Sequence, residues 1–221
     1  MDHWEGLKDA SWFWYPEVSP ELTILGSSEA LETIERAFSH PSYLPLEILA
    51  ESSLPKLELK SMRMGDKHSF KCCTIHAFPL NHYIGQGSRK QRLQSVGWRV
   101  SLNQGPTVCY LCDHEPTPQT ASTELQALKG SQLAVLDAHF PSIEEQAYGH
   151  GSLEHAAMLA QQFPQLLVLA AHHSPTLSDE VIRAAYEKLK GSSSNFLLAK
   201  EGTTYSWVHE TGVFRLLPPA R

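Results

Sequence analysis

Three short apolar runs in the second half of the chain constrain its fold most. They are Thr107–Cys112, Leu133–Leu136 and Leu166–Ala171. Each is too short for a typical helix and is bounded by turn-forming residues, which is typical of strands buried on both faces. Segments with helical spacing of apolar residues follow the second and third runs, at 152–162 and 178–190. This alternation predicts an α/β fold with a largely parallel sheet.

The rest of the chain gives weaker indications of the same class. A strand is predicted at 22–26, and Ser27 or Ser28 can cap a following helix that carries Leu31, Ile34 and Phe38 on one face. Prolines punctuate 40–66, which we expect to be irregular. Further strands are predicted around 70–74, 96–102, 195–199, 204–208 and 213–217. Without a repeat, a low-complexity tract or a visible boundary, the sequence predicts a single domain over 1–221.

Composition excludes several classes of protein. The chain has 221 residues, 42% of them apolar, and a formal net charge of −6. This is enough apolar material for a core, and the acidic balance disfavours a general nucleic-acid binder. The loop at 85–92 is polar and locally basic, and it is the best candidate for contact with an anion. The longest apolar run is far shorter than the roughly 20 residues of a membrane span, and the first residues do not form a secretory signal. We therefore expect a cytoplasmic protein.

Cysteines are too few for a disulfide scaffold, with four in the chain. Cys109 and Cys112 form a C-x-x-C pair, but this pair lies in a predicted strand, where residues three apart point to opposite faces. We expect reduced thiols without a metal or redox role.

Polar side chains follow each of the three apolar runs at the point where it ends. Strand ends at one edge of an open α/β sheet are where ligands bind. The alternative interpretation is that these are solvated strand ends, but three in succession favour a common site. Imidazole and carboxylate groups together suit zinc, iron or manganese. The groups are Asp113-His114, Asp137-Ala138-His139 and His172-His173, with His82 and Asp2-His3 elsewhere in the chain.

The order of these groups resembles the metallo-β-lactamase-fold hydrolases, in particular the ribonuclease Z-like and phosphodiesterase-like branch. That family carries a His-x-His-x-Asp-His motif, of which the start of this chain resembles only the second half. The resemblance therefore implies an αββα sandwich that is N-terminally incomplete. It covers nearly the whole chain and rests on Met1–Gly6, Phe78–His82, Val108–Asp113, Leu136–Phe140 with Tyr148–Ser152, Leu167–Pro175 and Leu198–Gly202.

The resemblance implies a set of metal ligands. One ion would be held by Asp2, His3 and His172, with Asp113 bridging to a second ion that retains His82. Two protein ligands make a poor zinc site, so we expect at most one ion to bind well. The cofactor implied is zinc, as one or two ions, with manganese or iron as alternatives.

Catalytic roles are implied for two residues. Asp2 would orient the attacking water, and His150 would contact the phosphoryl oxygens or protonate the leaving oxygen. The alternative for His150 is a loop histidine that caps the helix starting near Ser152. Asp137 is either a partner that fixes a histidine tautomer or a solvated strand end.

The other histidines and the N-terminal aromatic residues are assigned outside the site. His172 is preferred over its neighbour His173 as the ligand, because adjacent residues at a strand end point to opposite sides. The aromatic side chains near the N-terminus are expected either to pack on absent strands or to line a pocket mouth. The histidines placed outside the site are His76, His114, His139 and His155, and the aromatic residues are Trp4, Trp12, Phe13, Trp14 and Tyr15.

The predicted function is a metal-dependent hydrolase that acts on a phosphodiester or small ester through a metal-activated water. The alternative is a degenerate, non-catalytic binding module or gene fragment of the same fold. Expected partners are small molecules, with nucleic acid disfavoured, no membrane contact and a homo-oligomer as an open alternative.

Overall fold

The computed structural model describes residues 21–38, 56–85 and 89–217. The chain divides into two compact units, Met1–Arg63 and Met64–Arg221.

The first unit contains a small parallel sheet and one helix. Strand β1 (Glu21–Gly26) pairs in parallel with β2 (Lys56–Ser61), and helix α1 (Ser28–Phe38) follows β1. The Oγ atom of Ser27 accepts a hydrogen bond from the backbone amide of Ala30, so the predicted N-cap is confirmed. Strand β2 lies within the stretch predicted to be irregular, and that expectation was wrong, because the sequence of β2 alternates charged and apolar residues and pairs with β1.

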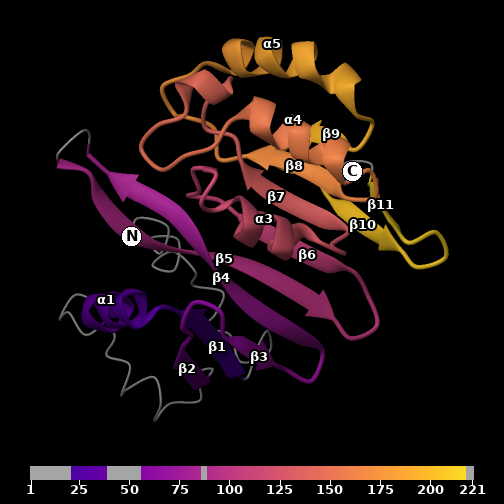
Figure 1. Ribbon diagram of the computed structural model, residues 1–221. Coiled ribbons are helices and arrows are strands. Elements are labelled where there is room, and N and C mark those ends of the chain that lie inside the picture. The colour runs from indigo at the N-terminus through magenta and orange to yellow at the C-terminus, as the bar shows by residue number, and fades with distance from the viewer. Residues whose placement is uncertain (1–20, 39–55, 86–88, 218–221) are drawn as a thin grey trace. The chain divides into compact units, whose positions relative to one another are not determined.

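The second unit is built on a seven-stranded mixed sheet in the order β3-β4-β5-β6-β7-β8-β9 (Figure 1). Pairing is antiparallel from β3 to β6 and parallel from β6 to β9. The α/β class is thereby confirmed. The strands are β3 (Lys67–Ser69), β4 (Cys73–Ile84), β5 (Gln91–Leu102), β6 (Thr107–Leu111), β7 (Leu133–Asp137), β8 (Leu167–Ala171) and β9 (Phe196–Leu198).

Helices connect the parallel strands and cover one face of this sheet (Figure 1). Helix α3 (Ala121–Leu128) contacts β4, α4 (Leu153–Gln162) lies on β7 and β8, and α5 (Asp179–Leu189) packs against α4. Ser178 caps α5, as predicted, with its Oγ accepting from the amide of Val181. Two short 3-10 turns, Ile143–Glu145 and Lys190–Ser192, and the hairpin of β10 (Tyr205–Val208) with β11 (Val213–Leu216) complete the unit.

The core lies between the sheet and these helices. Leu111, Val168 and Phe196 from the strands pack with Leu128 and Leu153 from the helices, each almost fully buried. Burial on both faces explains why the parallel strands are continuous apolar runs. Because β6, β7 and β8 run in parallel, their carboxyl ends meet at one edge of the sheet.

Two features of this unit differ from the prediction. The strand predicted around 70–74 is wrong in extent, because β4 runs from Cys73 to Ile84 through Pro79, contains His82 and pairs with β5 along its whole length. Helix α3 was not predicted, because its eight residues give little helical periodicity. No described helix is long and apolar enough to cross a membrane.

Candidate metal centre

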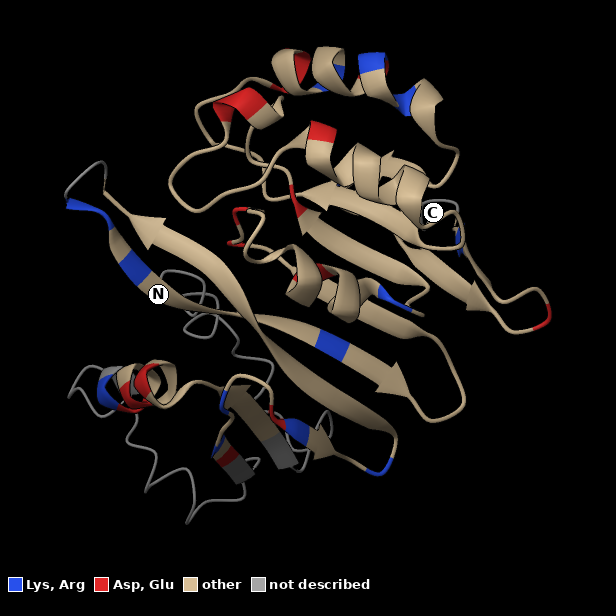
Figure 2. Cartoon of the chain, in the orientation of Figure 1, with Lys and Arg blue, Asp and Glu red and all other residues tan. Residues whose placement is uncertain are grey.

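The carboxylate of Asp113 lies among three histidines at the edge where the parallel strands end. Its Oδ1 is 3.4 Å from Nε2 of His172, 3.8 Å from Nδ1 of His150 and 4.0 Å from Nε2 of His82. Asp113 follows β6 and His172 follows β8, whereas His150 comes from the loop before α4. Figure 2 shows acidic residues at the ends of β6 and β7. Four segments that are distant in sequence thus supply one cluster.

His82 is oriented by a backbone carbonyl. Its Nδ1 donates a hydrogen bond to the carbonyl oxygen of Gly149 at 3.1 Å. In the neutral imidazole this places the proton on Nδ1 and the lone pair on Nε2, the atom that faces Asp113. A hydrogen bond from the distant ring nitrogen is the usual arrangement for a metal-binding histidine.

Asp137 is the buried acceptor that organises the loops around the cluster. Its side chain is 2% exposed, and Oδ2 accepts from Nδ1 of His150 at 2.9 Å and from the amide of His114 at 3.2 Å. Its Oδ1 accepts from the amides of His139 and Gly151, each at 3.1 Å. Burial alone would raise the pKa of Asp137, but hydrogen bonds and charge from His150 and His172 hold that pKa well below its usual range. Asp137 is therefore ionised at neutral pH and fixes the ring of His150.

Two glycines flank His150, and a side chain at either position would clash with neighbouring atoms. Gly149 has φ +82°, and a Cβ added there would lie 2.4 Å from the backbone nitrogen of Tyr83 and 2.6 Å from Nδ1 of His82. A Cβ on Gly151 would lie 2.6 Å from the carbonyl oxygen of Asp137. Only glycine allows this segment to lie so close to β4 and β7.

Asp113 and His172 also have left-handed backbone conformations, with φ of 58° and 59°. This conformation costs a residue with a side chain roughly 1–2 kcal/mol. Strained residues of this kind gather where function requires a particular side-chain direction. Here the strain turns both side chains back over the ends of β6 and β8, toward the cluster.

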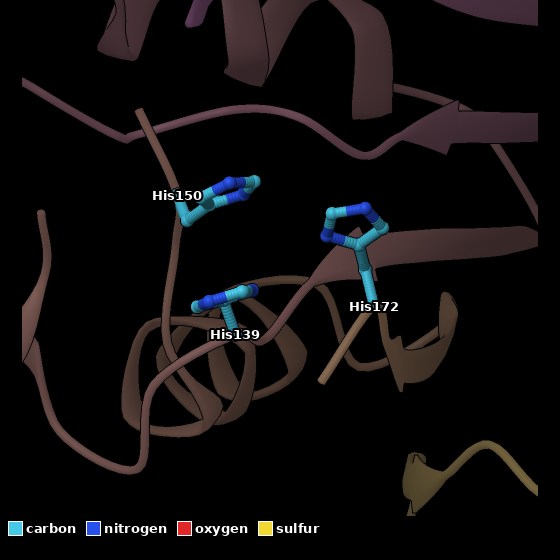
Figure 3. A group of neighbouring side chains, drawn as sticks. All are labelled: His139, His150 and His172. Carbon is cyan, nitrogen blue, oxygen red and sulfur yellow. The ribbon is translucent and has the colours of Figure 1, made fainter. Parts of the chain in front are cut away.

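His139 lies in the cluster, so the expectation that it lies outside was wrong. Its ring stacks on that of His150, with centroids 4.2 Å apart and an interplanar angle of 13° (Figure 3). Ring nitrogens of His139, His150 and His172 lie within 4.8 Å of one another. The cause is the loop after β7, which returns so that the amide of Phe140 donates to the carbonyl of Gly151. The sequence pattern Asp-Ala-His at the end of an apolar run was the available signal.

The structure tests the predictions for His173 and His150, but not those for Asp2 and His3. Asp2 and His3, like the N-terminal aromatic residues, lie outside the described residues. His173 points away from His172, and its Nδ1 donates to the carbonyl of Ala138 at 2.9 Å. His150 does not cap the following helix, since Ser152 accepts from the amide of His155 instead.

The remaining side chains named from the sequence lie outside the cluster. His114 is 2% exposed, and its Nδ1 accepts from the amide of Asn81. His155 bonds to the buried carboxylate of Glu124. Cys109 donates to the carbonyl of Ala127 on α3. In the basic loop, the ammonium group of Lys90 lies over the ring of Tyr83, and residues 86–88 fall outside the described part of the chain.

The donor set fits a divalent metal ion. Tetrahedral zinc with bonds of about 2.1 Å separates neighbouring ligand atoms by about 3.4 Å, close to the distance between Asp113 and His172. Nδ1 of His139 is buried without a hydrogen-bond partner among the described residues, which suits a nitrogen that has another role. Imidazole and carboxylate ligands together favour zinc, manganese or iron over calcium.

Comparison with known proteins gives a family and a fold. The family model for the beta-lactamase superfamily domain matches residues 1–173. No curated protein matches the chain in sequence. Among solved structures, the metallo-beta-lactamase fold protein YhfI from Bacillus subtilis has a TM-score of 0.56 and 14% identity, over 82% of this chain and 63% of that one.

Two further structures are similar to the same degree. A diphosphatase from the PhnP family has a TM-score of 0.56 and 14% identity, over 88% of this chain and 62% of that one. An isothiocyanate hydrolase from Delia radicum gut bacteria has a TM-score of 0.56 and 12% identity, over 82% of this chain and 66% of that one. This chain thus spans less than two thirds of the length of each of the three structures. At these identities the likeness shows the fold alone.

Proposed function

The chain belongs to the beta-lactamase superfamily, and from this premise we propose that it is a metal-dependent hydrolase of a phosphodiester, phosphoanhydride or small ester. The observation that supports the proposal is the position of Asp113. Its Oδ1 lies 3.4 Å from Nε2 of His172 and 4.0 Å from Nε2 of His82. A carboxylate oxygen close to two imidazole nitrogens is a donor set that suits zinc, manganese or iron.

Asp113, His82 and His172 would hold the metal. When bound, a divalent ion activates water and stabilises the negative charge that develops on the substrate. The resemblance adds Asp2 and His3 as ligands. A separate test of these two is the metal content of the Asp2→Ala and His3→Ala proteins, each expected to be lower than that of the unmodified chain.

His150 is the residue we assign to the substrate. Nδ1 of His150 donates a hydrogen bond to Asp137 at 2.9 Å, and that carboxylate also accepts hydrogen bonds from three backbone amides. With Nδ1 of His150 bonded to Asp137, Nε2 is the ring nitrogen that would contact a phosphoryl or leaving-group oxygen. The same pair fixes the direction of that contact.

Among small substrates, phosphodiesters and phosphoanhydrides are favoured by this contact. The diphosphatase of the PhnP family shares the fold and supports that choice, whereas the isothiocyanate hydrolase shows that the fold also serves other bonds. Zinc as the ion, a cytoplasmic location and a small-molecule substrate complete the proposal.

Hydrolysis of bis(p-nitrophenyl) phosphate and p-nitrophenyl acetate tests it. Asp113→Ala and His172→Ala should abolish turnover of the substrate that the protein accepts, with circular dichroism unchanged. His209→Ala is the matched control, since His209 is exposed in the β10–β11 turn. Turnover that survives Asp113→Ala would refute the proposal. A metal-loaded protein that hydrolyses neither substrate would favour the non-catalytic binding module instead.

A further inference from the structure

A cavity lies on β3, β4 and β5, and its lining shares no residue with the candidate metal centre. It has a volume of about 340 Å³ and is lined by Lys67, Thr74, His76, Phe78, Arg99, Ser101 and Gln126. All these residues belong to the second unit. Strand register explains the grouping, because Lys67, His76 and Arg99 pair across the three strands, as do Thr74 and Ser101.

The lining is cationic and carries no opposing charge. Two of its side chains are basic and none of the described lining residues is acidic. Strands β3, β4 and β5 contain Lys and Arg but neither Asp nor Glu (Figure 2). The nearest acid in sequence, Asp66, precedes β3 and is not part of the lining. The pKa of His76 is lowered first by burial and then by the charges of Lys67 and Arg99, which reports the positive potential in the cavity.

The guanidinium group of Arg99 is fixed by hydrogen bonds from one of its nitrogen atoms, Nη1. Its Nη1 donates to the carbonyls of Ala127 at 3.0 Å and Lys129 at 2.8 Å, at the end of α3. Within the described residues, the hydrogen bonds of its side chain use only Nη1. A guanidinium fixed on one side presents its remaining N–H groups in a set direction, which suits a planar or tetrahedral oxyanion.

Hydroxyl groups complete the donor set. Thr107 Oγ1 donates to Ser101 Oγ at 3.0 Å, so the hydrogen of the Ser101 hydroxyl remains for another acceptor. Thr74 contributes a second hydroxyl on the neighbouring strand. Its Oγ1 lies 3.2 Å from Oγ of Ser69, and its hydrogen remains for an anion when Ser69 is the donor of that pair. Phe78, only 4% exposed, forms an apolar part of the wall.

We propose that this cavity binds the phosphate group of a small phosphorylated molecule, at a site separate from the metal centre. Lys67 and Arg99 balance a doubly charged phosphate, while Ser101 and Thr74 donate to its oxygens. The volume exceeds that of the phosphate itself and leaves room for an organic group beside Phe78. The proposal does not depend on hydrolysis at the metal centre.

Titration of isotope-labelled protein with inorganic phosphate and with glycerol phosphate, followed by amide NMR shifts, tests the proposal. Saturable shifts at Thr74, His76 and Ser101 are expected, and Lys67→Glu should weaken binding at these amides at least tenfold. Lys188→Glu on α5, an exposed lysine outside the cavity, should leave the affinity unchanged.

Three outcomes would overturn the proposal. They are shifts confined to the metal-centre residues, equal affinity in the Lys67→Glu protein, and no saturable shift at all. Because charge reversal could disturb β3, Lys67→Ala serves as a second variant and should also weaken binding. Activity measured separately on the same variants distinguishes failure here from failure of the hydrolase proposal.

Discussion

Replacing Asp137 by asparagine should destabilise the protein far more than its small change in size suggests. The carboxylate accepts four hydrogen bonds while its side chain is 2% exposed, two at each oxygen. An asparagine keeps one acceptor oxygen. Its NH₂ group replaces the other carboxylate oxygen and then faces the two N–H donors that this oxygen had accepted from. Losing two hydrogen bonds to a charged group at about 1.5–3 kcal/mol each predicts a loss of roughly 3–6 kcal/mol in the free energy of unfolding. This is a large part of the about 5–15 kcal/mol that stabilises a typical domain.

Urea unfolding of chelator-treated protein measures this loss without a contribution from bound metal. Asp179→Asn is the matched control, because Asp179 is 85% exposed and its ion pair with Arg183 is 3.8 Å long. That change should cost less than about 1 kcal/mol. If Asp137→Asn lowers the free energy of unfolding by no more than Asp179→Asn does, Asp137 does not organise these loops.

Two further predictions concern packing beside the site and the thiols. Gly149→Ala should displace His82 and lower metal content as well as stability, because its Cβ would lie 2.6 Å from Nδ1 of that histidine. Gly202→Ala is the matched control, because Gly202 has φ +71° and no atom lies within 4 Å of an added Cβ. This change should cost only the backbone strain of roughly 1–2 kcal/mol and leave the metal content unchanged. Equal metal loss in both proteins would contradict the reasoning. Cys72 is exposed and should react with a chromogenic disulfide at pH 8 in the native protein, whereas burial raises the pKa of Cys112 to about 12 and should keep it unreactive until urea is added. A single common rate for all thiols would argue against the burial of Cys112.

The sequence predicted the parallel part of the sheet well, because strands buried on both faces carry an unbroken apolar pattern. Strands β6, β7 and β8 and helices α4 and α5 lie where the pattern indicated. The pattern failed where contacts with distant parts of the chain, and not the local sequence, determine the secondary structure. Strand β4 continues through Pro79, which normally marks a boundary, because β5 pairs with it along twelve residues. The short α3 is stabilised by its contacts, including the bonds from Arg99, more than by its own periodicity.

At the site, the residues that end the parallel strands could be predicted, since parallel strands carry their C-terminal ends to one edge. His139 belongs to one of these strand-end groups, but the pattern did not indicate that its ring faces the cluster, because this position depends on how the loop after β7 folds back onto Gly151. The constraint on Gly149 was likewise hidden, since it arises from the close approach of His82, 67 positions away in sequence. Long-range loop packing of this kind leaves no periodic trace in the sequence.

Metal content per chain, measured by elemental analysis of protein purified without chelator, tests the central claim most directly. We expect at least one equivalent of zinc, manganese or iron in the unmodified chain. We also expect a clear loss of metal in Asp113→Ala and in His172→Ala, but not in His209→Ala. Metal that is absent from the unmodified chain, or retained equally in all of these proteins, would contradict a metal centre at the ends of β6 and β8.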